Sequence, residues 1–267
     1  MKVSYIIDHI VKWLREYVEK SGLKGFIVGV SGGVDSAVTS ALCAGTGKKV
    51  ILLNMPIHQL QYQTDLAAEH IKWLEKEHSN VAGREIDLTS SFQGIKKSLP
   101  HEIQDDLTMA NTRSRLRMLT LYAFASHNRM LVAGTGNKVE DFGVGFYTKY
   151  GDGGVDLSPI ADLMKSEVYL LAEELGIIQA ILNAPPTDGL FEDSRTDEGQ
   201  LGASYAELES AMEFDIKISG SDLRDESELD RRQKEVLAIF RKLNRANRHK
   251  MEPVPVCRIP GEFKNLI

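Results

Sequence analysis

Residues 25–38 of the sequence read Gly-Phe-Ile-Val-Gly-Val-Ser-Gly-Gly-Val-Asp-Ser-Ala-Val. The apolar run at the start, rich in β-branched residues, predicts a buried strand that breaks at the turn Ser31-Gly32-Gly33. A helix is expected to begin at Ser36. The glycines allow positive φ and let main-chain N–H groups approach a ligand, and the helix N-terminus behind them carries partial positive charge. The stretch therefore predicts a strand–loop–helix unit suited to phosphate.

The segments on either side of this unit alternate between strands and helices. Apolar runs predict further strands at 49–55, 81–88 and 130–133. Helical periodicity predicts helices at 3–18, 64–78, 110–126, 163–175 and 226–247. Such alternation predicts an α/β fold with a Rossmann-like parallel sheet and helices on both faces. Ligands of such sheets bind at the carboxyl ends of the strands, where the Ser-Gly-Gly turn would lie.

Two internal segments lack helical or strand periodicity. The stretch 147–159 is glycine-rich and predicted to be mostly loop, whereas 184–202 is polar, with two prolines and an acidic run. So long an irregular segment is either a functional lid or a disordered insert. The run Pro-Val-Pro-Val at 253–256 predicts an ordered tail. We expect a single domain over 1–267, with a core at about 20–180 and a mobile loop and C-terminal helical part at about 184–267.

Composition excludes several classes of protein. The formal net charge of −6 over 267 residues argues against non-specific binding to nucleic acid or to a membrane surface. Two cysteines, Cys43 and Cys257, with no C-x-x-C pattern, favour neither a disulfide framework nor a cysteine zinc site. Residues 1–20 carry charges throughout and match neither a signal peptide nor a membrane span. We therefore expect a cytoplasmic enzyme with no nucleic-acid or membrane partner.

The turn after the first strand has no lysine where a Walker A loop would place one. Its Ser-Gly-Gly-Val-Asp-Ser sequence instead resembles the pyrophosphate loop of the N-type ATP pyrophosphatases. The resemblance implies an adenine nucleotide alpha hydrolase-like fold and cleavage of ATP between the α and β phosphates. It implies ATP contacts at Gly29, Val30, Ser31, Gly32, Gly33, Val34, Asp35 and Ser36. A glycine-rich turn without a ligand is the alternative.

Later motifs narrow the resemblance. Gly-Thr-Gly-Asn-Lys begins at Gly134, Lys-Tyr-Gly-Asp-Gly-Gly begins at Lys149, and Asn-x-x-x-Arg-x-Arg-Met precedes both at 111–118. With His249-Lys250 near the end, nearly the whole chain resembles an ammonia-dependent NAD synthetase. That family amidates nicotinic acid adenine dinucleotide (deamido-NAD) to NAD through an adenylated intermediate, releasing AMP and pyrophosphate. The alternatives are a GMP synthetase-like or tRNA-modifying ATP pyrophosphatase, and a non-catalytic nucleotide-binding module.

ATP cleavage needs a divalent cation held by carboxylates, here Mg²⁺. Asp35, at the head of the predicted helix, is placed to bind it, and the resemblance makes Glu140 the second ligand. An acid favoured by the helix dipole and a surface acid are the alternatives for these two residues. The resemblance also implies ATP contacts at Thr135, Lys165 and Thr187. We expect Lys165 to balance charge on the leaving pyrophosphate, although a solvated lysine and a threonine N-cap are ordinary alternatives.

The resemblance implies deamido-NAD contacts at Arg115, Lys149, Asp156, His249 and Lys250. An Asp that starts a turn and a solvated basic helix end are the alternatives for the last three. Ammonium must lose a proton before it attacks, and we expect Asp152 to accept that proton. The segment after Met55-Pro56 matches the family only loosely, so we assign no adenine contact there. Between Glu140 and Lys149 the chain carries one residue more than the commonest family spacing, which leaves the geometry of that turn open.

The resemblance also bears on the nitrogen donor and on assembly. Glutamine-using relatives carry an N-terminal nitrilase-like domain, whereas the synthetase motifs here begin by residue 25. We therefore expect ammonia as the nitrogen donor, free or supplied by a separate protein. The family resemblance implies a homodimer, and the apolar faces of the 3–18 and 110–126 helices suit such an interface.

Overall fold

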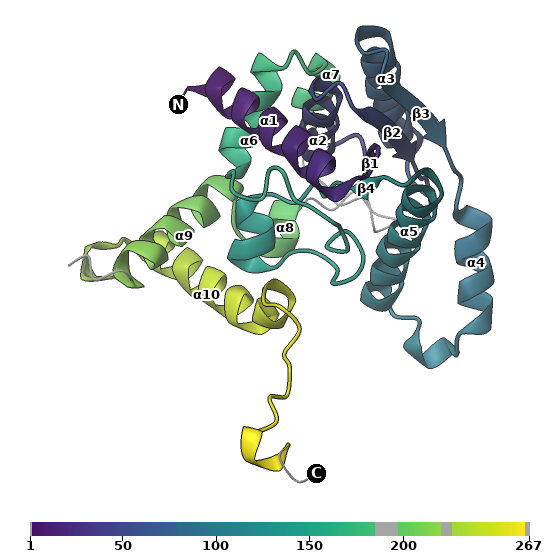
Figure 1. The fold of residues 1–267 in the computed structure, drawn as a ribbon. Helices are drawn as coiled ribbons and strands as arrows, with labels where there is room; N and C mark the ends of the chain where they lie inside the picture. Colours follow the sequence, from purple (N-terminus) through teal and green to yellow (C-terminus); the bar gives the residue numbers. More distant parts are fainter. Residues whose placement is uncertain (1, 185–196, 220–225, 265–267) are drawn as a thin grey trace.

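Four strands form the parallel sheet of this computed structural model, which describes residues 2–184, 197–219 and 226–264. The strands are β1 (Gly25–Gly29), β2 (Lys49–Asn54), β3 (Val81–Glu85) and β4 (Leu131–Val132). Their order across the sheet is β3-β2-β1-β4, and every pairing is parallel. The predicted α/β class and parallel sheet are therefore confirmed (Figure 1).

Helices cover both faces of the sheet, as the alternation of strands and helices predicted. Along β1, Phe26 and Val28 pack into one apolar core, and Ile27 between them packs into a second core. The first core is closed by α1 (Val3–Ser21), α2 (Val34–Gly45), α3 (Gln61–Glu77) and α6 (Lys165–Glu174). The second is closed by α4 (Thr89–Ser98) and α5 (Asp106–Asn128).

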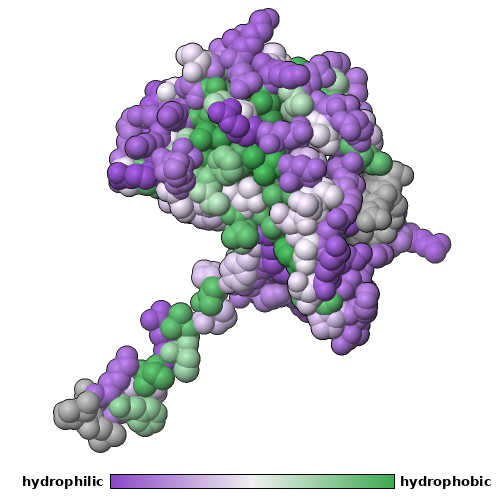
Figure 2. Space-filling view, turned by 90° about the vertical axis from the view of Figure 1, so that its right-hand side faces the viewer, coloured by the Kyte–Doolittle hydropathy of each residue, from purple (hydrophilic) through white to green (hydrophobic). Residues whose placement is uncertain are grey.

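A third apolar core lies among the C-terminal helices. It joins the π-helical turn η2 (Val139–Val144) to α9 (Tyr205–Ser219) and α10 (Arg231–Met251). Short helices complete the described chain: η1 (His101–Ile103), α7 (Gln179–Leu182), α8 (Asp197–Leu201), η3 (Glu226–Glu228) and η4 (Gly261–Phe263). After α10 the chain leaves the body of the molecule as an extended tail that ends in η4 (Figures 1 and 2).

Several helix boundaries differ from the sequence-based predictions, and caps explain two of them. α5 begins four residues early because the Asp105 side chain accepts a hydrogen bond from Thr108 N at 3.0 Å. α10 begins at Arg231 because the Asp230 side chain caps Gln233 N at 2.8 Å. α2 begins at Val34 rather than Ser36.

Some helices were missed altogether. α4, α7 and α9 were not predicted, and residues 197–201 of the segment predicted to be irregular form α8. α4 buries fully only Phe92, so it contributes few side chains to the core. Residues 185–196 of the same segment lie outside the described chain. η2, a π-helix over Val139–Val144, contains Glu140 and overlaps the interval between Glu140 and Lys149, where the sequence carries one residue beyond the commonest spacing.

The strand order places a crevice beside the loop that follows β1. From β1 the chain proceeds outward to β2 and β3, and it later returns to the opposite side of β1 as β4. The segments that leave the carboxyl ends of β1 and β4 therefore diverge, which is where ligands bind in open α/β sheets. No helix in the described ranges is long and apolar enough to cross a lipid bilayer.

Candidate active site

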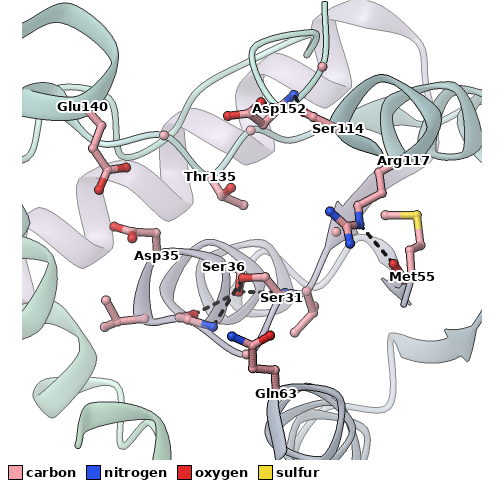
Figure 3. A pocket seen from close by; sticks show the side chains of 18 of the residues that line it. Ser31, Asp35, Ser36, Met55, Gln63, Ser114, Arg117, Thr135, Glu140 and Asp152 are labelled. Carbon is pink, nitrogen blue, oxygen red and sulfur yellow. Dashed lines mark hydrogen bonds between the residues drawn. The ribbon is translucent and has the colours of Figure 1, made fainter. Parts of the chain in front are cut away.

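A cavity of about 250 Å³ opens at the carboxyl ends of β1, β2 and β4 (Figure 3). All eight residues of 29–36 line it, together with Thr135, Glu140, Asp152 and Lys165. The structure thus brings together every described residue that the sequence assigned to ATP, to the metal or to catalysis. Thr187 lies outside the described residues.

Hydrogen bonds made by the side chains of Ser31 and Ser36 fix the conformation of the loop 31–33 beside the cavity. Ser36 Oγ donates to Gly33 O at 2.9 Å and accepts from Ser31 N at 3.2 Å, while Ser31 Oγ accepts from Gly33 N at 3.3 Å. Gly32 has φ +90°, and a Cβ there would lie 2.8 Å from Gln63 O of α3. Glycine is therefore required here both by the backbone conformation and by the close approach of α3.

The charged centre of the cavity is a lysine between two carboxylates. Lys165 Nζ lies 2.5 Å from Asp35 Oδ2 and 3.1 Å from Glu140 Oε1. Asp35 stands in the first turn of α2, Glu140 in η2, and Lys165 begins α6. Lys165 is 5% exposed, so its charge is almost fully withdrawn from water and balanced by these two carboxylates.

Two residues that the sequence assigned no role complete this centre. Asn137 Nδ2 donates to Asp35 Oδ1 at 3.3 Å, and its Oδ1 accepts from Glu140 N at 3.1 Å. Tyr205 of α9 donates through its hydroxyl to Glu140 Oε1 at 2.5 Å. Asn137 belongs to the Gly-Thr-Gly-Asn-Lys motif, which was a usable signal. Tyr205 lies outside every motif, 65 residues from Glu140 in the sequence.

The ionisation of these groups follows from burial and from mutual attraction. Burial raises the pKa of Asp35 above its ordinary value although Lys165 opposes the shift. Burial also acts to raise the pKa of Glu140, but the Lys165 charge and the Tyr205 hydroxyl outweigh it, and that pKa is lowered. Burial alone would lower the pKa of Lys165, yet the two carboxylates raise it. Lys165 therefore stays protonated.

The carboxylates suit Mg²⁺ that arrives with a nucleotide. In the described part of the chain, no three His, Cys, Asp or Glu side chains gather closely enough to form a metal site by themselves. Asp35 and Glu140 converge on one cation, the Lys165 ammonium, so they already form a two-carboxylate site for positive charge. Mg²⁺ is commonly held by one or two carboxylates together with substrate phosphates and water. The donor set fits that mode of binding.

Asp152 lies on the wall of the same cavity and is anchored on one side only. Its Oδ1 accepts from Ser114 Oγ at 2.7 Å and from Thr148 N at 2.9 Å. Neither of these bonds involves Oδ2. Desolvation by the surrounding protein raises the pKa of Asp152, although the bonds from Ser114 and Thr148 oppose the shift. A carboxylate of this kind is a better proton acceptor than an ordinary aspartate.

The half of the cavity away from the carboxylates is more apolar. Met55, Leu66, Met118 and Leu121 line it beside Gln63 and Arg117. Arg117 Nε donates to Met55 O at 3.0 Å (Figure 3), which ties α5 to the end of β2. Apolar walls with a few polar groups suit a nucleoside. The sequence assigned no adenine contact near Met55, and only the folded chain reveals this wall.

The residues that the resemblance assigned to deamido-NAD lie outside that cavity, and four of them form a second group. Arg115 Nε donates to Lys149 O at 3.3 Å, and Lys149 Nζ donates to His249 O at 2.6 Å. Lys250 Nζ donates to Gly145 O at 2.8 Å and to Tyr147 O at 2.9 Å. This places three cations and an imidazole where α5, the 145–150 loop and the end of α10 meet.

Asp156 stands apart from that group. Its Oδ1 accepts from Tyr122 OH at 3.0 Å and its Oδ2 accepts from Val132 N at 2.8 Å. Both oxygens therefore serve contacts within the protein, between the 151–157 loop, α5 and β4.

Comparison with known proteins connects this geometry to a family. Residues 6–254 match the family model described as NAD synthase. An NH(3)-dependent NAD(+) synthetase of Syntrophomonas wolfei is 34% identical over 270 residues, which span 99% of this chain and all of that protein. An NH(3)-dependent NAD(+) synthetase of Alkaliphilus metalliredigens is 40% identical over 223 residues, which span 80% of this chain and 87% of that protein.

Solved structures agree with this relationship. The NMN synthetase of Francisella tularensis superposes with a TM-score of 0.81 at 27% identity, covering 98% of this chain and 99% of its own. An NH3-dependent NAD synthetase of Campylobacter jejuni shares the fold, with a TM-score of 0.77 at 24% identity over 97% of this chain and its whole length. Sequence and structure agree over nearly the whole chain, which therefore belongs to the NAD synthase family.

Proposed function

We propose that this protein amidates deamido-NAD to NAD, using ATP and ammonia and releasing AMP and pyrophosphate. The observation that carries the proposal is the shared cavity. In it a phosphate-binding loop, a lysine between two carboxylates and the one-sidedly anchored Asp152 face the same space. These are the parts that adenylation of a carboxylate followed by amide formation requires.

The first step activates the nicotinate carboxylate, which is a poor electrophile. One of its oxygens attacks the α-phosphorus of ATP, and the bond between that phosphorus and the bridging oxygen breaks. Pyrophosphate leaves with the electron pair, and a mixed anhydride of nicotinate and AMP forms. The positive N-terminal end of α2, which follows the loop at 31–33, and the Lys165 ammonium stabilise the charge that gathers on the leaving group.

The second step forms the amide. Ammonia attacks the carbonyl carbon of the anhydride, the carbon–oxygen bond to AMP breaks with its electron pair going to the phosphate oxygen, and that departing oxygen takes the proton that the nitrogen loses. Asp152 takes the proton from ammonium before the attack. No side chain acts as a nucleophile, so catalysis consists of positioning, proton transfer and electrostatic stabilisation.

We assign Asp35 and Glu140 to Mg²⁺ that enters with ATP. When bound, Mg²⁺ neutralises negative charge on the phosphates, as divalent cations do in phosphoryl transfer. Lys165 already shows that the two carboxylates attract one positive charge between them.

Incubation of the protein with ATP, Mg²⁺, ammonium and deamido-NAD tests the function. We expect NAD and AMP to appear in equal amounts, as measured by chromatography. Release of AMP without NAD, or a requirement for glutamine, would contradict the proposal.

A second candidate substrate is the mononucleotide, nicotinic acid mononucleotide. It is favoured by the TM-score of 0.81 to the Francisella tularensis NMN synthetase. Competition between the mononucleotide and deamido-NAD in one reaction decides between them through the ratio of their kcat/KM values. We expect the dinucleotide to win, because the curated relatives over 80–99% of the chain are NAD(+) synthetases.

Replacing Asp152 by asparagine tests the proton acceptor. Asn keeps an oxygen for Ser114 Oγ and Thr148 N, so the loop should keep its shape while the base is lost. We expect kcat with ammonium to fall about 10²–10⁴-fold at neutral pH. The raised pKa of Asp152 means that the wild type loses activity at a higher pH on acidification than an ordinary aspartate would allow.

The pH profile of kcat distinguishes this role from a structural one. As the pH rises toward the pKa of ammonium, ammonia forms in solution and the defect of the Asp152→Asn variant should shrink. Asp162→Asn is the matched control, because the Asp162 side chain is 96% exposed and pairs with Lys138 outside the cavity. A pH-independent defect, or none, would refute the assignment.

We further propose that the chain acts as one synthetase unit and as a homodimer in the cytoplasm. One unit is supported by Tyr205 of the C-terminal part, which reaches Glu140 beside the core of the sheet. Two cysteines in 267 residues favour a reducing compartment.

The dimer is supported by exposed apolar side chains on α5 and on the tail. These are Leu107, Leu119, Val254, Val256, Ile259 and Phe263. Figure 2 shows apolar residues along the tail where it leaves the body of the molecule. Burying such surface against a second copy would remove it from water. Light scattering should give twice the mass of one chain; a single-chain mass would contradict the dimer.

A further inference from the structure

α9 contacts the charged centre of the active site at two points. Tyr205, the first residue of α9, donates its hydroxyl hydrogen to Glu140 Oε1 at 2.5 Å. Its ring also lies against the Lys165 ammonium, with Nζ 4.8 Å from the ring centroid. One turn further along α9, Glu209 accepts from Ser166 N at 2.9 Å and from Ser166 Oγ at 2.7 Å.

The hydroxyl of Tyr205 is committed to Glu140. A hydroxyl has one hydrogen and can donate to only one carboxylate at a time. Asp197 Oδ2 also lies near it, at 3.2 Å, but the 2.5 Å contact is the stronger and assigns the hydrogen to Glu140. Tyr205 is 7% exposed, so little water competes for that bond.

This contact determines how the carboxylate of Glu140 is turned. Oε1 is held by two donors, Tyr205 OH and Lys165 Nζ, which enter from α9 and from α6. Holding one oxygen from two sides fixes the plane of the carboxylate and leaves the direction of Oε2 defined. Residues that hydrogen-bond a metal-ligating carboxylate orient it in this way and tune its affinity.

The contact between Glu209 and Ser166 positions Lys165, the second residue that donates to Glu140. α6 begins at Lys165, and the first N–H groups of a helix have no partner within the helix. Glu209 satisfies one of them at Ser166 and so holds the start of α6 against α9. One helix thereby fixes both Glu140 and Lys165.

We propose that Tyr205 is a positioning residue for ATP-dependent chemistry, whose hydroxyl orients Glu140 toward the cation that accompanies ATP. The inference rests on the proposed role of Glu140 as a ligand of Mg²⁺. It assigns a function at the site to α9, which lies outside every motif that the sequence displays.

Calorimetric titration with ATP tests the inference without any turnover. Tyr205→Phe removes only the hydroxyl and keeps the ring against Lys165. We expect its Kd for ATP in the presence of Mg²⁺ to rise about tenfold or more. In EDTA, its Kd for ATP should match that of the wild type. Tyr17→Phe on α1, a tyrosine that is 40% exposed and remote from the cavity, is the matched control.

A double-mutant cycle separates orientation of Glu140 from a general structural effect. In a Glu140→Gln background, Tyr205→Phe should have no further effect on Mg²⁺-dependent ATP binding, because the carboxylate it orients is gone. A thermal melt of each variant establishes that it is folded. Additive losses in the cycle would mean that the hydroxyl acts elsewhere, and they overturn the inference.

The outcomes also distinguish this inference from the proposed function. If wild-type protein binds ATP equally well with and without Mg²⁺, the metal role of Glu140 is wrong and the inference falls with it. If Mg²⁺ strengthens ATP binding by the wild type and by Tyr205→Phe to the same extent, only the role of Tyr205 is overturned.

Discussion

Replacing Lys165 by methionine is expected to reduce kcat/KM by about 10³-fold. Methionine fills a similar volume but removes the ammonium that lies between Asp35 and Glu140. The developing charge on pyrophosphate then loses its protein cation. Steady-state kinetics with saturating ammonium measure the effect.

The same change should also destabilise the protein. Two carboxylates withdrawn from water would be left facing each other without their shared cation, which costs about 3–5 kcal/mol in the free energy of unfolding. Denaturant titration measures this cost. Because Asp35 and Glu140 would then repel, their double replacement by Asn and Gln should restore part of the stability but none of the activity.

Lys138→Met is the matched control for this prediction. Lys138 pairs with Asp162 at 2.9 Å on the surface, so its loss should change stability by less than about 1 kcal/mol. Equal effects of the two lysine replacements would show that burial between Asp35 and Glu140 gives Lys165 no special role.

Gly32→Ala is expected to weaken ATP binding by roughly 30- to 100-fold, which corresponds to about 2–3 kcal/mol. Alanine at φ +90° is strained, and its Cβ would lie 2.8 Å from Gln63 O. The loop can relieve that contact only by moving away from α3, and its N–H groups move with it. Calorimetric titration with ATP measures the loss.

The Gly47→Ala variant separates the strain of a positive φ from the close approach of a neighbouring element. Gly47 also has positive φ, +70°, but no atom lies within 4 Å of the Cβ position. This variant should lose about 1 kcal/mol of stability and none of its ATP affinity. If Gly32→Ala bound ATP as tightly as Gly47→Ala does, close packing of the loop against α3 would be irrelevant to nucleotide binding.

Local patterns in the sequence were sufficient to predict the strands of the sheet and the loop that follows β1. β1, β2 and β4 are short apolar runs, whereas β3 ends in Arg84 and Glu85, and each strand was predicted within a few residues of its observed position. The Ser-Gly-Gly turn was recognisable because a positive φ and a close backbone approach demand particular residues at adjacent positions. Of the two long C-terminal helices, α10 was predicted and α9 was not; α9 packs into an apolar core away from the sheet.

The sequence by itself thus determined the fold class and the strand–loop–helix unit at 25–38, and it singled out Asp35, Glu140 and Lys165 as candidate site residues. Only the tertiary structure decided that Lys165, 130 residues from Asp35, lies between Asp35 and Glu140. It also decided that the Tyr205 hydroxyl donates to Glu140 and that Asp156 serves contacts within the protein. The physical reason is that motifs record local demands on the backbone and side chains. A salt bridge or hydrogen bond between distant residues exists only once packing has brought their elements together.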